Sequence, residues 1–190
     1  MLRKGKIIVY VLWVIITISL VITYFVSPEN FTPEYLSEFI KKFNNEMLLI
    51  YIILTFIRGF FLIPSTPFVI AGGILFPDRL LLVLFISLAG IMFSATSLYY
   101  FADILGFSKY LDAKFPSKID KWKSRLNTPT SILYIAGWSF TPFVPTDLIC
   151  YATGVIKTPF KNMFIGVFVG ELILCSFYVF SGASILEFVH

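Results

Sequence analysis

The sequence predicts an all-α polytopic membrane protein: an inverted repeat with two opposed re-entrant helical hairpins, about three full spans and interfacial amphipathic helices. Three observations carry this prediction: an apolar composition, two apolar stretches broken by prolines and glycines, and basic clusters beside the apolar runs. Of the 190 residues, 58 % are hydrophobic and 14 % are charged. Soluble domains carry about 25 % charged residues, so this composition argues strongly against a soluble protein.

The first 46 residues are predicted to form an N-terminal transmembrane anchor and an outer interfacial helix. Residues 7–26 are an uncharged apolar run, long enough to cross about 30 Å of hydrocarbon as a helix. Arg3, Lys4 and Lys6 precede this run and no Ala-x-Ala cleavage site follows it. We therefore expect a retained span with a cytoplasmic N-terminus. In residues 27–46, apolar side chains recur at helical spacing among charged ones, which is typical of a helix on the membrane surface.

Residues 47–190 are predicted to form the core, in which two apolar stretches each fold back as a hairpin. These stretches, residues 47–76 and 128–156, are both interrupted near their middle by prolines and then by glycine. A proline inside a helix removes a backbone hydrogen bond and clashes with the preceding turn, so two half-helices fit better than one straight span. The predicted hinges of the hairpins are Pro67, Gly72, Gly73, Pro142 and Gly154.

A further predicted span follows each hairpin, at residues 80–102 and 162–186. The hairpins also match each other, because Gly73 and Gly154 stand nine residues after Pro64 and Pro145 respectively. One span separates the hairpins, so they would enter the membrane from opposite sides, as an inverted repeat does. The alternative is that the prolines merely kink two long spans; the corresponding positions of the interruptions argue against it.

The segment of residues 106–127 is predicted to be a basic amphipathic helix on an anionic lipid leaflet, the alternative being an ordinary solvated helix. Its basic face consists of Lys109, Lys114, Lys118, Lys121, Lys123 and Arg125. With the N-terminus inside, eleven of the 15 Lys and Arg residues lie in predicted cytoplasmic segments, which agrees with the positive-inside rule. Since each basic cluster flanks an apolar run, we expect membrane lipids and no nucleic acid as partners.

The two proline-rich breaks carry a resemblance to a known family. Residues 64–76 (PSTPFVIAGGILF) and 142–154 (PFVPTDLICYATG) resemble the hairpin motifs of the DedA and SNARE-associated Golgi protein superfamily, the VTT-domain proteins. The resemblance implies opposed re-entrant hairpins and a role in moving lipids across membranes. It implies phospholipid scrambling in eukaryotic relatives and, in some bacterial ones, the return of a polyprenyl-phosphate carrier and proton-motive-force-dependent phenotypes. This sequence has Ser139 and Asp103 where the family often has arginine, and Ser65-Thr66 where the DedA branch carries an acid.

Three charges fall inside the apolar stretches: Arg58, Asp147 and Glu171. Each costs about 2.5–3.5 kcal/mol at the bilayer centre on insertion scales, and such residues are usually functional. Guanidinium binds phosphate bidentately, and helix N-termini add N–H donors for the same anion. The predicted headgroup-binding residues are Arg58, Pro64, Ser65, Thr66, Ser139, Pro145, Thr146 and Asp147, and the predicted proton-coupling residues are Asp147 and Glu171. The alternative is a buried ion pair, Arg58 with Asp147 or Glu171, that only joins the two halves.

The predicted function is therefore that of a lipid translocator for phospholipid or polyprenyl-phosphate headgroups, in a bacterial cytoplasmic membrane. A proton-coupled secondary transporter or ion exchanger of the same fold is the alternative, and an assembly factor is not excluded. We expect no enzyme, because a serine dyad needs a buried histidine and the one histidine is His190. We expect no metal or cofactor either, since Cys150 and Cys175 stand alone without ligand spacing. Whether the chain forms a homo-oligomer stays open.

Overall fold

The computed structural model describes residues 15–20, 22–23, 26–61, 63–104, 122–142 and 144–189, and within them the chain forms helices and turns without strands. In these ranges three helical stretches are long and apolar enough to cross a membrane: Asn44–Phe61, Pro77–Ala102 and Phe160–Ser181. The prediction of an all-α membrane protein is confirmed. The first of these stretches is the part of the chain that we predicted as the first arm of a hairpin.

Some predicted features lie wholly or mostly outside the described residues. Of the predicted span at residues 7–26, the structure describes residues 15–20, 22–23 and 26, which are helical. Of the basic segment, Lys109, Lys114, Lys118 and Lys121 lie outside the described residues, and residues 122–126 are helical. In that described turn, the Arg125 guanidinium lies 6.0 Å from the centre of the Trp122 ring.

The first hairpin is preceded by a surface helix and consists of two helices separated by a proline turn. The elements before the turn are η1 (Pro28–Phe31), the surface helix α2 (Pro33–Lys41), η2 (Asn44–Glu46) and α3 (Met47–Ile57), which is the first helix of the hairpin. The chain continues through η3 (Arg58–Phe61), a turn that contains Pro64, and α4 (Thr66–Leu75). Pro67 stands in the first turn of α4, where a helix loses no hydrogen bond to proline. The helix therefore breaks where the prolines predict.

The second hairpin has the same plan. Helix α8 (Ser131–Phe140) ends before Pro142, and α9 (Thr146–Ile156) begins after Pro145, which has an extended backbone. Helix α9 ends at Lys157, whose φ of 61° is left-handed, a backbone conformation that closes many helices. A long helix follows each hairpin: η4 (Pro77–Arg79) leads into α5 (Leu80–Ile104), and α10 (Phe160–Val189) closes the chain.

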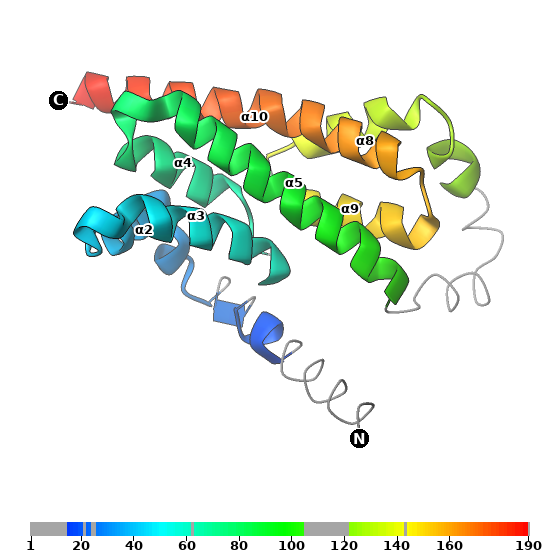
Figure 1. Cartoon of the computed structure of the whole chain (residues 1–190), viewed down its shortest axis with the longest axis horizontal. Helices are drawn as coiled ribbons and strands as arrows, with labels where there is room; N and C mark the ends of the chain where they lie inside the picture. The colour runs from blue at the N-terminus through cyan, green and yellow to red at the C-terminus, as the bar shows by residue number, and fades with distance from the viewer. Residues whose placement is uncertain are drawn as a thin grey trace.

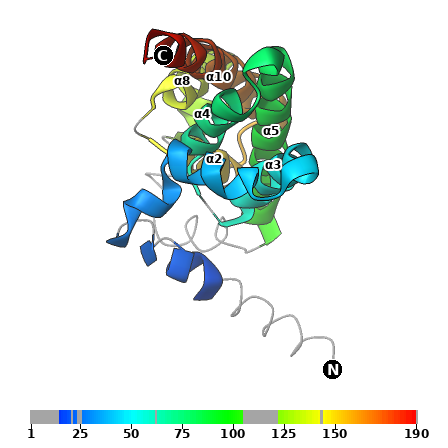
Figure 2. The same cartoon turned by 90° about the vertical axis from the view of Figure 1, so that its left-hand side faces the viewer.

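The two hairpins occupy opposite ends of the molecule, with α5 and α10 running along its length (Figure 1). We call the two helices of each hairpin its first arm (α3 or α8) and its second arm (α4 or α9). Each first arm packs on the long helix of its own repeat, α3 on α5 and α8 on α10. Each second arm packs instead on the long helix of the other repeat, α4 on α10 and α9 on α5. Figure 2 shows α4 beside both α5 and α10 at the end where α2 and α3 lie. The second arms thus bind the two repeats together.

Glycines mark equivalent contacts inside the two repeats. A Cβ at Gly90 on α5 would lie 3.0 Å from the Thr55 carbonyl oxygen on α3, and a Cβ at Gly170 on α10 would lie 2.5 Å from the Ala136 carbonyl oxygen on α8. Thr55 and Ala136 both stand nine residues before their repeat proline. Gly90 and Gly170 stand 26 and 25 residues after the same prolines. Corresponding parts of the two repeats therefore make a similar close helix–helix contact, which is the geometry that small residues allow in membranes.

Replacing Gly170 with alanine tests this contact. The added methyl group would meet the Ala136 carbonyl, and overpacking of this kind typically costs about 1–3 kcal/mol. We expect Gly170→Ala to lower the thermal unfolding midpoint in detergent. The matched control is Gly137→Ala on α8, where a Cβ would meet nothing within 4 Å; alanine there stabilises a helix by up to about 1 kcal/mol. Equal midpoints for both variants would contradict the packing.

Candidate functional site

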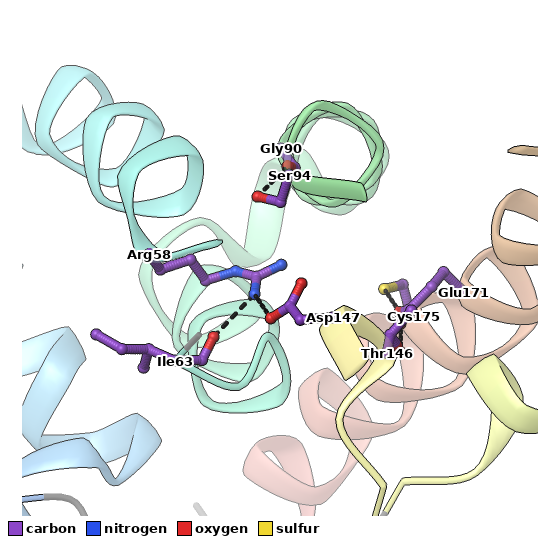
Figure 3. A network of polar contacts seen from close by, with 8 residues as sticks. All are labelled: Arg58, Ile63, Gly90, Ser94, Thr146, Asp147, Glu171 and Cys175. Atoms are coloured by element: carbon purple, nitrogen blue, oxygen red, sulfur yellow. Dashed lines mark hydrogen bonds and ion pairs between the residues drawn. The ribbon is translucent and has the colours of Figure 1, made fainter. Parts of the chain in front are cut away.

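The three intramembrane charges lie where the two hairpins meet (Figure 3). Arg58 in η3 stands at the tip of the first hairpin, Asp147 in the first turn of α9 at the tip of the second, and Glu171 within α10. Only 3 %, 6 % and 1 % of their respective surfaces are exposed. The breaks in the apolar stretches thus bring charged side chains from both repeats into the protein interior, where a polar group needs a partner.

Arg58 connects the two hairpin tips. Its Nη1 donates a hydrogen bond to the Ile63 carbonyl oxygen, 3.0 Å away, across the turn of its own hairpin. The same nitrogen lies 3.8 Å from Oδ2 of Asp147, an ion pair that is too long for a hydrogen bond. The Nε of Arg58 has no hydrogen-bond partner among the described residues. The guanidinium therefore keeps donor capacity inside the protein while it faces a carboxylate.

Asp147 also occupies a favourable place on its own helix. It stands in the first turn of α9, where the partial positive charge of the helix N-terminus stabilises an anion. The sequence did not decide whether Arg58 pairs with Asp147 or with Glu171. The structure brings Arg58 to Asp147, because Arg58 stands at the end of α3, just before the first break, Asp147 stands in the first turn of α9, just after the second break, and the two breaks face each other.

Glu171 has different partners. The Thr146 hydroxyl donates to its Oε1, and the Cys175 thiol lies 3.6 Å from its Oε2 as a donor. Thr146 directly precedes Asp147, so adjacent residues at the N-terminus of α9 bind Glu171 and pair with Arg58. Among the described residues, Glu171 forms no ion pair. The two buried carboxyl groups therefore differ: Asp147 forms an ion pair with Arg58, whereas Glu171 accepts hydrogen bonds from neutral donors and feels Arg58 and Asp147 only through space.

The remaining predicted headgroup residues lie around this centre without joining its hydrogen bonds. Pro64 and Ser65 lie in the turn before α4, and Thr66 begins α4; all three are half-buried, and the described contacts place no hydrogen bond between their side chains and Arg58. Ser139 is fully buried on α8, next to Gly170, and its hydroxyl has no partner among the described residues. Pro145 is exposed, and its carbonyl accepts a 3.5 Å hydrogen bond from Trp138.

The predicted hinge residues divide into two groups. Pro142 stands in the turn of the second hairpin, and Pro67 stands in the first helical turn after the first break. The glycines lie inside helices instead, Gly72 and Gly154 at close contacts with neighbours and Gly73 at an ordinary one. A Cβ at Gly72 would overlap the Tyr51 hydroxyl, and a Cβ at Gly154 would overlap the Tyr99 carbonyl oxygen; Gly73 faces the Val179 carbonyl oxygen.

Two polar features were missed by the sequence reasoning. Cys175 was identified only as a buried free thiol, yet it stands one helical turn after Glu171 and therefore on the same face of α10. The other feature is a buried hydrogen bond, 2.9 Å long, between the Tyr51 hydroxyl on α3 and Ser87 on α5. Spacing along α10 could have revealed the first, whereas only the packing of α3 on α5 reveals the second.

A metal centre was not expected from the sequence. The described part of the chain contains no group of three or more His, Cys, Asp or Glu side chains that could hold a metal ion. The polar centre therefore consists of one guanidinium, two carboxyl groups, hydroxyls and a thiol. Such a set can bind an anionic group, exchange a proton, or join the two hairpins.

The ion pair between the hairpins is testable by a double-mutant cycle. Removing one member of a buried pair costs about 3–5 kcal/mol, because the other charge is left without compensation. We expect Arg58→Met or Asp147→Leu alone to lower the free energy of unfolding by roughly that amount, and the double variant to recover most of the loss. Arg79→Met, at an exposed arginine of η4, is the control. Additive losses in the double variant would rule out coupling.

Comparison with known proteins agrees with this architecture. The VTT domain family matches residues 63–184. The chain is also similar to the Transmembrane protein 41 homolog of Caenorhabditis elegans, with 28 % identity over 154 residues that cover 79 % of this chain and 61 % of the relative. The chain thus corresponds to about 61 % of that relative's length, and no solved structure matches it. This multi-pass membrane protein belongs to the VTT domain family.

Proposed function

We propose that this protein is a lipid translocator that carries the headgroups of phospholipids or polyprenyl phosphates across the bilayer, and not an enzyme. One observation carries the proposal: Arg58 is buried where two broken helices meet, and its Nε has no partner while its counter-ion stands 3.8 Å away. A guanidinium presents five donors in a planar fork that matches phosphate. The phosphate group of a lipid would supply the negative charge and the hydrogen-bond acceptors that the Arg58 guanidinium does not find within the protein.

The breaks in the hairpins support this role. The N-terminus of α9, at Thr146, adjoins the ion pair, and the N-termini of helices offer N–H donors to anions. Irregular backbone at membrane depth is tolerated where it is enclosed by protein or lines a cavity. A headgroup would move along this polar centre while its acyl or prenyl tails stay in the surrounding lipid. Ser139, Ser65 and Thr66 supply further hydroxyls on either side of the centre.

A second candidate function, a proton-coupled transporter or ion exchanger of the same fold, is favoured by Glu171. This carboxyl group is buried and accepts hydrogen bonds only from the neutral donors Thr146 and Cys175 among the described residues. A buried carboxylate without an ion-pair partner is costly, so Glu171 is suited to taking up and releasing a proton. Asp147 is less suited, because it lies within ion-pair distance of Arg58, whereas Arg58 acts on Glu171 only from further away. In a lipid translocator the same group would couple lipid movement to a proton gradient.

The distribution of charge supports an orientation. In the sequence, the segments beside the second hairpin carry eight basic residues, whereas those beside the first hairpin carry three: Lys41, Lys42 and Arg79. By the positive-inside rule, the second hairpin would enter from the cytoplasm, in a bacterial cytoplasmic membrane. Lys123 and Arg125, next to the exposed Trp122, would contact anionic lipids.

Lipid exposure in liposomes tests the proposed function. Purified protein is reconstituted with fluorescent phospholipid or polyprenyl phosphate, and the fraction reached by a membrane-impermeant quencher is followed. We expect rapid exposure that falls about 10–100-fold in Arg58→Gln, the effect of losing one or two charge-assisted hydrogen bonds. Arg79→Gln, at an exposed interfacial arginine, serves as the control and is expected to match the wild type.

Two results would contradict the proposal. Exposure by the wild type no faster than in empty liposomes, for every lipid and with or without a pH gradient, would exclude a lipid translocator. If a folded Arg58→Gln variant exposed lipid as fast as the wild type, Arg58 would not lie on the path of the headgroup. The unfolding midpoint of each variant, measured in the same detergent, separates a local effect from a loss of fold.

Glu171→Gln tests proton coupling in the same liposomes. Glutamine keeps the shape and an acceptor for Thr146 but carries no titratable proton. We expect any acceleration by an imposed pH gradient to disappear in this variant while exposure without a gradient stays within about twofold of the wild type, a loss well below that of one hydrogen bond. Glu46→Gln, at an exposed residue of η2, should keep the acceleration. A gradient response that survives in Glu171→Gln would assign coupling to another group.

A further inference from the structure

The contacts between the two repeats are unequal, although the sequence places equivalent residues at both. Gly73 on α4 faces the Val179 carbonyl oxygen on α10, and Gly154 on α9 faces the Tyr99 carbonyl oxygen on α5. Gly73 and Gly154 both stand nine residues after their repeat proline. These are therefore the two copies of one contact, formed where the second arm of each hairpin meets the long helix of the other repeat.

One copy of this contact is tight and the other is loose. A Cβ at Gly154 would overlap the Tyr99 carbonyl oxygen and lie 2.9 Å from the Ala102 Cβ. A Cβ at Gly73 would lie 3.6 Å from the Val179 carbonyl oxygen, an ordinary contact, with nothing else within 4 Å. Glycine is therefore required at position 154, whereas an alanine would fit at position 73 and would favour the helix. The packing in this structure gives no reason for the glycine at position 73.

The contacts inside each repeat do not share this inequality. Gly90 lies against Thr55 and Gly170 against Ala136, and a Cβ at either site would come within 3.0 Å of a backbone carbonyl oxygen. Each long helix and the first arm that packs on it are thus held closely in both repeats. The difference is confined to the contacts between the repeats, which is where a rigid-body movement of one repeat against the other would act.

We propose that the protein alternates between two arrangements of its repeats, and that the structure is the one in which α9 packs tightly on α5 while α4 packs on α10 only at ordinary van der Waals distance. In the other arrangement α4 approaches α10 more closely, Gly73 packs against the Val179 carbonyl oxygen as tightly as Gly154 packs here against that of Tyr99, and α9 loosens from α5 near Gly154. Rocking of repeats around a central site is the motion that inverted repeats support. Gly73 is then the glycine that the second arrangement requires. The inference does not depend on which solute the protein moves.

The tight contact of α9 with α5 is accompanied by a hydrogen bond that has no equivalent at the contact of α4 with α10. The Tyr99 hydroxyl donates to the Thr158 carbonyl oxygen, 2.5 Å away, and so ties the end of α5 to the segment between α9 and α10. The residue equivalent to Tyr99 on α10 is Val179, which has no hydroxyl. The described arrangement is therefore the favoured one. The pair of Arg58 and Asp147 lies between these two contacts, at the meeting of the hairpin tips, so the movement would open the polar centre to alternate ends of the bundle.

Distances between spin labels test the proposal without any transport assay. Labels at Ile74 and Phe180 report on the contact of α4 with α10, and labels at Tyr100 and Lys157 report on the contact of α9 with α5. The background is Cys150→Ala with Cys175→Ser, which keeps a donor for Glu171. We expect two distance populations for each pair in lipid nanodiscs, with the population that matches this structure in excess.

Two variants should change these populations in opposite directions. Gly73→Ala fits the described arrangement and obstructs the other, so it should leave one population and keep the unfolding midpoint. Tyr99→Phe removes the Thr158 hydrogen bond and should enlarge the second population about fivefold. Gly137→Ala, at a glycine with open space around it, is the matched control and should keep both populations of the wild type.

The outcomes separate this proposal from the proposed function. A single population for the wild type, or two unchanged populations in Gly73→Ala, would overturn the two arrangements whatever the protein transports. In the liposome assay, Gly73→Ala should lower lipid exposure about tenfold or more, and Gly137→Ala should not. Two label populations without lipid exposure by the wild type would leave the movement standing and refute the lipid function.

Discussion

The ion pair between Arg58 and Asp147 is the interaction on which the rest of this structure depends. A guanidinium and a carboxylate inside a membrane protein need each other, because each alone is costly to remove from water. Here the two groups come from the tips of different hairpins. The pair therefore links two helix breaks that come from different repeats and lie in the protein interior, where free backbone groups need partners within the protein.

The exchange of second arms joins the two repeats. Helix α4 packs on α10 and α9 packs on α5, so the second arm of each hairpin lies against the long helix of the other repeat. Gly154 lets α9 approach the α5 backbone closely at one of these contacts. The result is a centre that is polar in chemistry but enclosed in apolar helices, with Glu171 contributed by the wall and not by a hairpin tip. A centre of this kind suits a charged group that must cross a bilayer.

Much of this fold could be predicted from the sequence, because proline and glycine act locally. Pro64 and Pro145 cannot lie inside regular helices, so the hairpin breaks could be assigned to within a few residues. The burial of Arg58, Asp147 and Glu171 followed from their place in apolar stretches. The choice of Asp147 as the partner of Arg58 could not be predicted, since it depends on how two distant turns face each other.

The role of the glycines was also beyond sequence reasoning. Gly72, Gly73 and Gly154 were predicted as hinges because glycine often marks a bend, but they lie within helices at contacts between neighbours. Glycine permits both a bend and a close approach, and only tertiary packing distinguishes the two. The Tyr51–Ser87 hydrogen bond and the Cys175 thiol beside Glu171 depend on packing in the same way. Residue types predicted the chemistry of the centre, and the arrangement of helices decided which atoms meet.

The most direct test of the central claim is the distance between lipid phosphate and the Arg58 guanidinium. Solid-state NMR can measure the coupling of ³¹P in the lipid to ¹⁵N in arginine side chains, with Arg58→Lys as the difference sample, because Arg3, Arg79 and Arg125 can also meet headgroups at the membrane surface. The account predicts a short ¹⁵N–³¹P contact that disappears in Arg58→Lys. Identical ¹⁵N–³¹P signals from the wild type and the variant would contradict it, because no lipid phosphate would then reach the buried arginine.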